Sequence, residues 1–120
     1  MKVEISHVVE NGNHEKERLV LKVKSSTDIG DYILMQTGYN DESVTTNVKN
    51  TFWFPYKEVE TQDLVVVYTR KGKASSKKLK NGNTAHFFYW GIKKSIWDNE
   101  DRAPVLLFAP DWTSEAPENL

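Results

Sequence analysis

The residues with the clearest chemical potential lie in the basic segment, residues 70–82. This segment holds six cations and no acid, together with two glycines and two serines. Such a run could neutralise the phosphates of a polyanion, and Tyr68 or Phe87 beside it could stack on a base. The alternative is a solvated loop whose charges only keep the chain in solution. The candidate binding residues of this segment are Arg70, Lys71, Lys73, Lys77, Lys78 and Lys80.

A second cluster of polar atoms is the sequence WDNED at residues 97–101, which places three carboxylates and an amide within four residues. A hard cation such as calcium prefers oxygen ligands at this density. The spacing does not match the alternating ligands of an EF-hand loop, however, and no distant glutamate completes a set. The sequence favours a hairpin turn in which Asn99 adopts a left-handed φ and Asp98 bonds the backbone.

The three histidines, His7, His14 and His86, are far apart in the sequence. A zinc site needs three or four nitrogen or sulfur ligands, and the chain has no cysteine. All three histidines would therefore have to meet, and we expect no metal and no cofactor. A catalytic triad assembled from distant residues cannot be read from sequence, so a small hydrolase stays as an alternative.

The four tryptophan side chains could either pack in the hydrophobic core or line a surface that binds a ligand. We expect Trp53, Trp90 and Trp97 to pack in the interior, because a domain of this size needs large apolar side chains there. Together with Tyr56 they could instead line a cleft or a carbohydrate platform. Trp112 lies beyond the last expected strand, and it could either cap an open end of the sandwich or contact a partner.

Composition limits the class of protein. The chain has 120 residues, 38% hydrophobic and 28% charged, with a net charge of −1. This predicts one globular domain at residues 1–112 with an acidic, frayed tail at residues 113–120. No stretch is apolar enough for a membrane span, and the first residues lack the apolar core of a signal peptide, so we expect a cytoplasmic protein.

The pattern along the chain predicts strands and no helix. Alternating or β-branched runs predict strands at residues 2–9, 17–25, 32–36, 51–56, 64–69, 84–90 and 103–108. The first two are expected to form a hairpin, and the run LVVVYT at residues 64–69 is expected to lie inside a sheet. Residues 40–50 are read as a weak strand or a loop, and residues 91–99 as a turn or a short helical step. About seven to eight strands predict an all-β fold, a two-sheet β-sandwich or a small barrel, and the sandwich is preferred.

Several motifs follow one another in a characteristic order. They are Phe52-Trp53-Phe54-Pro55, the strand at residues 64–68, Trp90-Gly91, Trp97-Asp98-Asn99, and Asp101 before residues 105–108. Together with residues 29–34 (IGDYIL), this order resembles the lamin tail domain, a family of immunoglobulin-like β-sandwich modules. The resemblance implies an immunoglobulin-like fold and a binding role, and it implies no activity.

These observations favour a non-catalytic binding module over an enzyme. We expect a macromolecular partner, and a protein rather than a nucleic acid, held by the basic segment and Trp112. Nucleic-acid or other polyanion binding through residues 70–80 is the first alternative, and a small hydrolase is the second. The sequence predicts no membrane contact and does not indicate an oligomeric state.

Overall fold

The fold is described by a computed structural model that covers residues 1–120. It is all-β, as the sequence predicts, but it has ten strands where about seven to eight were expected. Two short 3-10 turns are η1 (Ile29–Asp31) and η2 (Pro117–Asn119). The strands are β1 (Val3–Val9), β2 (Arg18–Val23), β3 (Thr27–Asp28), β4 (Tyr32–Asn40), β5 (Ser43–Trp53), β6 (Glu58–Val59), β7 (Leu64–Tyr68), β8 (Ser75–Lys78), β9 (Thr84–Tyr89) and β10 (Arg102–Phe108). The additional strands are β3, β6 and β8, which are short and carry no sequence pattern. The ten strands form two main sheets and one small pair, β3–β6.

The larger sheet has five strands in the order β1-β2-β7-β9-β8. β1 and β2 form the expected antiparallel hairpin, with a bulge between Ile5 and His7. β7 lies inside the sheet, which confirms the interpretation of its β-branched run. Its two partners differ, because β2 pairs with it antiparallel and β9 pairs with it parallel.

The smaller sheet has three strands in the order β10-β4-β5, all antiparallel. The division of residues 40–56 into a weak segment and a separate aromatic strand is wrong, because β5 runs unbroken from Ser43 to Trp53. The missing alternation has a physical cause. Most side chains of β5 are exposed, and the register shifts twice against β4, so no period of two survives in the sequence.

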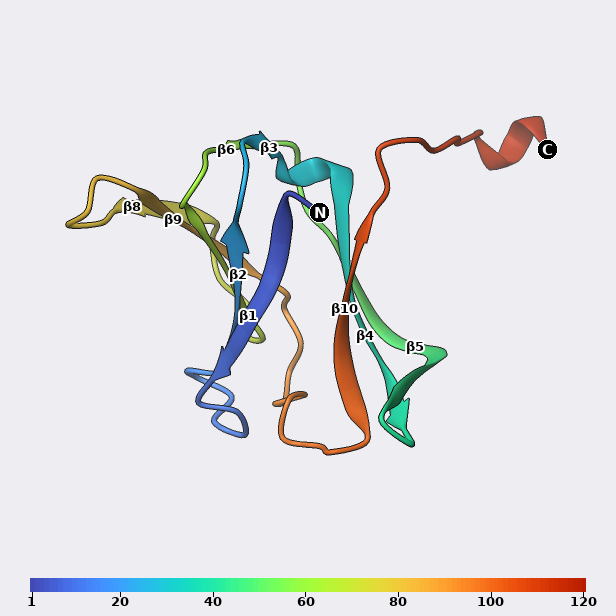
Figure 1. Cartoon of the computed structure of the whole chain (residues 1–120). Helices are drawn as coiled ribbons and strands as arrows, with labels where there is room; N and C mark the ends of the chain where they lie inside the picture. Colours follow the sequence, from blue (N-terminus) through green and yellow to red (C-terminus); the bar gives the residue numbers. More distant parts are fainter.

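The two sheets pack against each other around one core of 14 buried residues (Figure 1). The five-stranded sheet contributes mainly aliphatic side chains such as Leu19, Leu21 and Val67, and β4 contributes Tyr32 and Leu34. The hydrophobic effect acting on these side chains fixes which face of each strand turns inward.

The tryptophans divide between core and surface. Trp97 is buried and Trp90 packs against the core, as expected. Trp53 is 46% exposed, so its expected place in the core is wrong. Successive side chains of a strand point to opposite faces, and Phe52 and Phe54 both turn toward the core, so Trp53 must turn outward.

The reading of residues 70–82 as a loop is also wrong in part. Ser75–Lys78 forms the edge strand β8, antiparallel to β9. All four side chains of β8 are exposed, and β8 is held by its backbone pairing alone. A strand with no buried face leaves no hydrophobic period in the sequence.

Candidate functional site

The structure separates Arg70 from the five lysines predicted to bind with it. Lys71, Lys73 and Lys80 lie in the connections on either side of β8, and Lys77 and Lys78 lie on β8 itself; all five are exposed. Arg70 is half-buried, and its Nε donates to the carbonyl of Glu15 at 2.9 Å. The lysines are therefore a solvent-facing set, while Arg70 belongs to a fixed cluster.

That cluster is the arginine–tyrosine stack, which comprises Arg18, Tyr68, Arg70 and Tyr89. The rings of Tyr68 and Tyr89 are stacked, with centroids 5.1 Å apart and planes 15° apart. The guanidinium of Arg70 lies 5.1 Å from each ring centroid, and that of Arg18 lies 5.5 Å from Tyr68. Cation–π attraction stabilises this arrangement. Both guanidinium groups also donate to backbone carbonyls, Arg18 to Lys16 at 2.7 Å and Arg70 to Lys71 at 3.0 Å.

A pocket of about 310 Å³ lies next to this stack, lined by His14, Lys71, Gly91, Ile92 and Lys93. The backbone N–H of Gly91 donates to the carbonyl of Arg70 at 3.3 Å, which joins the pocket to the stack. Nε2 of His14 lies 2.7 Å from the carbonyl of Ile92, so this nitrogen donates and the ring is held in one orientation. The two ammonium groups of Lys71 and Lys93 at one opening give a positively charged pocket, and the carboxylate of Glu15 lies 3.9 Å from Nδ1 of His14 at its edge.

Trp112 lies on a different surface, where it joins Trp53 and Tyr56. It is 53% exposed, and its Nε1 donates to the hydroxyl of Tyr56 at 3.1 Å. Its ring meets that of Trp53 edge to face, with centroids 5.2 Å apart. The structure thus brings Trp112 to the aromatic element of β5 and does not bring it near the basic segment.

Trp53 and Trp112 continue an apolar surface on the outer side of the three-stranded sheet, which we call the tryptophan face. The strand register places Leu107, Ile33 and Trp53 in one row across β10, β4 and β5. Val105 and Met35 lie in the next row. Leu107 and Trp53 are exposed, the other three are half-buried, and no element of the chain covers this face.

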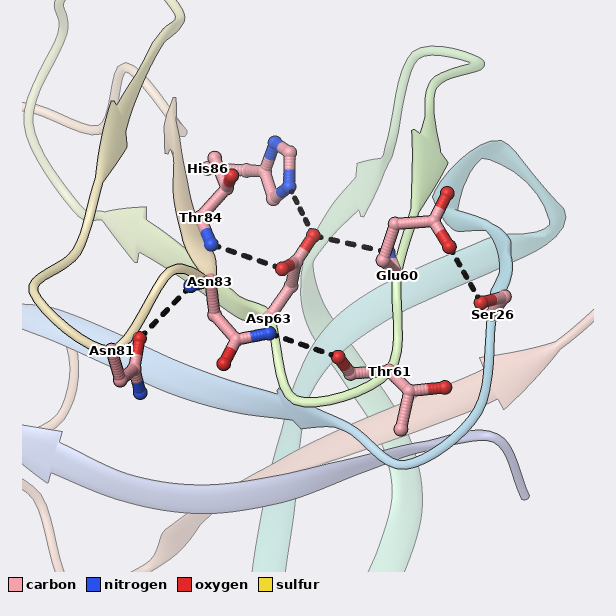
Figure 2. Close-up of polar contacts among 8 residues, drawn as sticks. All are labelled: Ser26, Glu60, Thr61, Asp63, Asn81, Asn83, Thr84 and His86. Carbon is pink, nitrogen blue, oxygen red and sulfur yellow. Dashed lines mark hydrogen bonds and ion pairs between the residues drawn. The ribbon is translucent and has the colours of Figure 1, made fainter.

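One buried polar pair was not predicted from the sequence, namely Asp63 and His86. Oδ2 of Asp63 accepts from Nε2 of His86 at 2.9 Å and from the backbone N–H of Glu60 at 3.0 Å, and Oδ1 accepts from the N–H of Thr84 at 3.0 Å (Figure 2). Burial raises the pKa of Asp63, but these three hydrogen bonds outweigh it, so the pKa lies below its usual value of 3.8.

This pair does not form a hydrolase site. Both side chains are buried, and Nδ1 of His86 is enclosed without a hydrogen-bond partner. None of the four surface pockets is lined by Asp63 or His86. A general base must reach its substrate, and this imidazole does not. The pair instead ties the turn before β7 to the start of β9.

A second buried carboxylate, Glu17, ties three segments together. It is fully buried and accepts hydrogen bonds from the backbone N–H groups of Gly12, Ile96 and Trp97 at 2.9 to 3.1 Å and from the hydroxyl of Thr69. These donors come from the turn before β2, the end of β7 and the loop before β10. Glu17 therefore fixes the loops that surround the positively charged pocket.

The structure brings no three histidine, cysteine, aspartate or glutamate side chains together at a spacing that could hold a metal ion. The carboxylates of residues 97–101 lie in a turn in which the N–H of Arg102 donates to the carbonyl of Asn99 at 3.3 Å. Asn99 does not adopt the left-handed φ expected of it.

Sequence reasoning missed the two buried carboxylates, Asp63 and Glu17, for a common reason. Besides Glu60 and Gly12, which are close in sequence, the partners of Asp63 and Glu17 lie 21 to 80 residues away, and no local pattern marks them. The arginine–tyrosine stack did leave a signal. Tyr68 and Tyr89 each end a strand, and Arg70 follows within two residues, so parallel pairing of the two strands would have brought them together.

No helix of the structure has the length and apolar character that crossing a membrane requires. Comparison of the sequence with protein-family models and with curated proteins gave no match, so the surfaces described above carry the argument about function.

Proposed function

We propose that this chain is a non-catalytic binding module of the immunoglobulin-like β-sandwich type, resembling the lamin tail domain, that holds a protein partner on its tryptophan face. The observation that carries the proposal is the row Leu107–Ile33–Trp53, which is apolar and uncovered. An exposed, contiguous apolar patch on a folded domain marks an interaction site.

The composition and shape of the tryptophan face support a protein as the partner. Tryptophan and methionine are enriched at protein interfaces, and this face carries Trp53, Met35 and Trp112. The strands hold it on rigid backbone, so little conformational entropy is lost when a partner binds. A polar ligand would gain little binding free energy on this face, because the row across β10, β4 and β5 has few groups that can form hydrogen bonds.

The experiment is a pull-down from the native source with three forms of the full chain, each treated with and without nuclease. The forms are the wild type, a Trp53→Ser/Leu107→Ser variant, and a control variant, Ile5→Ser/Leu120→Ser. The control also removes two exposed apolar side chains, one on β1 of the five-stranded sheet and one at the C-terminal end of the chain, which lies away from both sheets (Figure 1). A partner found this way is identified by mass spectrometry and its affinity is measured again with purified components.

We expect a protein that survives nuclease treatment, binds the control, and loses affinity for the Trp53→Ser/Leu107→Ser variant by about tenfold or more. A partner that binds this variant as well as the wild type, or that disappears after nuclease treatment, contradicts the proposal.

A further inference from the structure

The outer side of the five-stranded sheet carries aromatic rings and cations together; we call it the basic face. Strand pairing places Arg18 opposite Tyr68, and Tyr68 opposite Tyr89. Phe87 lies opposite Val66 on the same side, with its ring centroid 6.4 Å from that of Tyr68. Four neighbouring side chains from three adjacent strands therefore form one surface of rings and guanidinium groups.

Cations outnumber acids around this face, where the carboxylate of Glu15 lies 3.9 Å from Nδ1 of His14. Residues 70–94 contain eight cations and no acid, although the whole chain has a net charge of −1. None of these eight side chains, nor that of Arg18, is in an ion pair. Because no carboxylate neutralises them, their field is available to an anionic ligand.

The basic face has two kinds of binding position. Phe87 presents a ring, whereas the ring of Tyr68 is already in contact with that of Tyr89 and with the guanidinium groups of Arg18 and Arg70. Tyr89 is covered by the backbone of Gly72, where an added Cβ would lie 2.5 Å from the tyrosine ring. Beside the rings, Lys71, Lys93 and His14 line the positively charged pocket, whose volume of about 310 Å³ is ample for a phosphate group. An aromatic ring can stack on a base, and the pocket and the lysines can bind the phosphates that join successive nucleotides.

We infer that the basic face binds single-stranded nucleic acid, with a base stacked on Phe87 and the backbone held by Arg18, Arg70, the lysines of residues 71–80 and Lys93. A single strand fits better than a duplex, because a duplex keeps its bases stacked on each other and unavailable to protein rings. This inference is independent of the tryptophan face, which lies on the other sheet.

The test uses the purified full chain and a fluorescein-labelled oligothymidylate of about 12 nucleotides, followed by fluorescence anisotropy. We expect binding that weakens with salt, with a logarithmic slope near −3 for about four phosphate contacts. Unlabelled single strands should compete at lower concentration than a duplex of the same length or heparin.

Two variants separate the charge contribution from the stacking contribution. Lys77→Glu/Lys78→Glu/Lys80→Glu should weaken binding about tenfold or more, whereas the control Lys2→Glu/Lys49→Glu/Lys57→Glu, with the same change in charge elsewhere, should weaken it far less. Phe87→Leu keeps apolar bulk but loses the ring face, and should weaken binding about fivefold or more.

Three results would overturn the inference: no binding at low salt, equal loss in the two charge variants, or an affinity unchanged by Phe87→Leu together with equally effective competition by heparin. The last result would indicate a general contact with polyanions.

Thermal unfolding verifies that each variant is folded. The Lys77/Lys78/Lys80 variant changes only exposed side chains, so it remains informative if Phe87→Leu is destabilised. The Trp53→Ser/Leu107→Ser variant should bind the oligonucleotide normally, which distinguishes failure of this inference from failure of the proposed protein-binding function.

Discussion

Asp63 and His86 are joined by a buried hydrogen bond of 2.9 Å between Oδ2 and Nε2, although 23 residues separate them in the sequence. Asp63 ends the turn before β7, and His86 lies on β9, the parallel partner of β7. With the N–H groups of Glu60 and Thr84, the imidazole completes a set of three donors around one carboxylate. The bond therefore fixes how the two parallel strands begin relative to each other.

This arrangement predicts how stability depends on pH. The pKa of Asp63 is lower in the folded chain than its usual value of 3.8, so the unfolded chain takes up the proton first as the pH falls. The stabilisation from Asp63 should be complete above about pH 5 and should be lost as the pH falls below 4 and through the folded-state pKa. Asp63→Asn should lower the free energy of unfolding at pH 7 and make its decline below pH 5 shallower. Urea unfolding at pH 3 to 7 measures the free energy of unfolding and its dependence on pH. If the free energy of unfolding of Asp63→Asn fell as steeply below pH 5 as that of the wild type, the prediction would be wrong.

Replacing Glu17 should strongly destabilise the chain. Its carboxylate accepts from three backbone N–H groups and one hydroxyl in a fully buried position. Glu17→Gln turns one acceptor into a donor that faces other donors, and should lower the free energy of unfolding by about 2–4 kcal/mol. Denaturant unfolding measures this loss. Glu15→Gln, at an exposed neighbouring position, is the control and should have almost no effect.

Trp53 and Phe54 should respond differently to truncation, although they are adjacent. Phe54 is buried among core residues, so Phe54→Ala should cost about 3–5 kcal/mol. Trp53 is 46% exposed, and Trp53→Ser should cost about 1 kcal/mol, mainly from its contacts with Trp112 and the carbonyl of Gly30. Thermal and chemical unfolding test the pair. Equal losses would contradict the assignment of Trp53 to the outer face.

Gly72 should not tolerate a side chain. A Cβ at this position would lie 2.5 Å from Cδ2 of Tyr89, a ring that is itself stacked on Tyr68. Gly72→Ala should therefore lower stability by about 1–3 kcal/mol through overpacking. Unfolding measurements with the neighbouring Lys73→Ala as control should show the loss only for the glycine.

The strands that the sequence predicts well are those with one buried face. β1, β2, β7, β9 and β10 have recognisable apolar patterns, because packing against the core imposes a period of two or a continuous β-branched run. The adjacent aromatics Phe52, Trp53 and Phe54 show the limit of a composition argument. Strand geometry forbids all three from facing inward, so the alternation was a better guide than residue size.

Long-range relationships could not be predicted. The parallel pairing of β7 and β9, the place of β8 at a sheet edge, and the buried bonds of Glu17 all join residues that no local pattern connects. For the candidate sites, the sequence shows which residues are cations, since charge is visible in the composition, and their role in binding stays a prediction. It could not show that Arg70 is fixed between two tyrosine rings, or that Trp112 lies beside Trp53.

The position of β8 at the edge of its sheet has one further consequence. An edge strand presents unpaired N–H and C=O groups to any other chain that can extend the sheet, and lysines on such a strand oppose that self-assembly by charge repulsion. Lys77 and Lys78 occupy this protective position. Acetylation or replacement of these lysines by apolar residues would therefore expose the chain to edge-to-edge aggregation, whatever ligand the neighbouring surface carries.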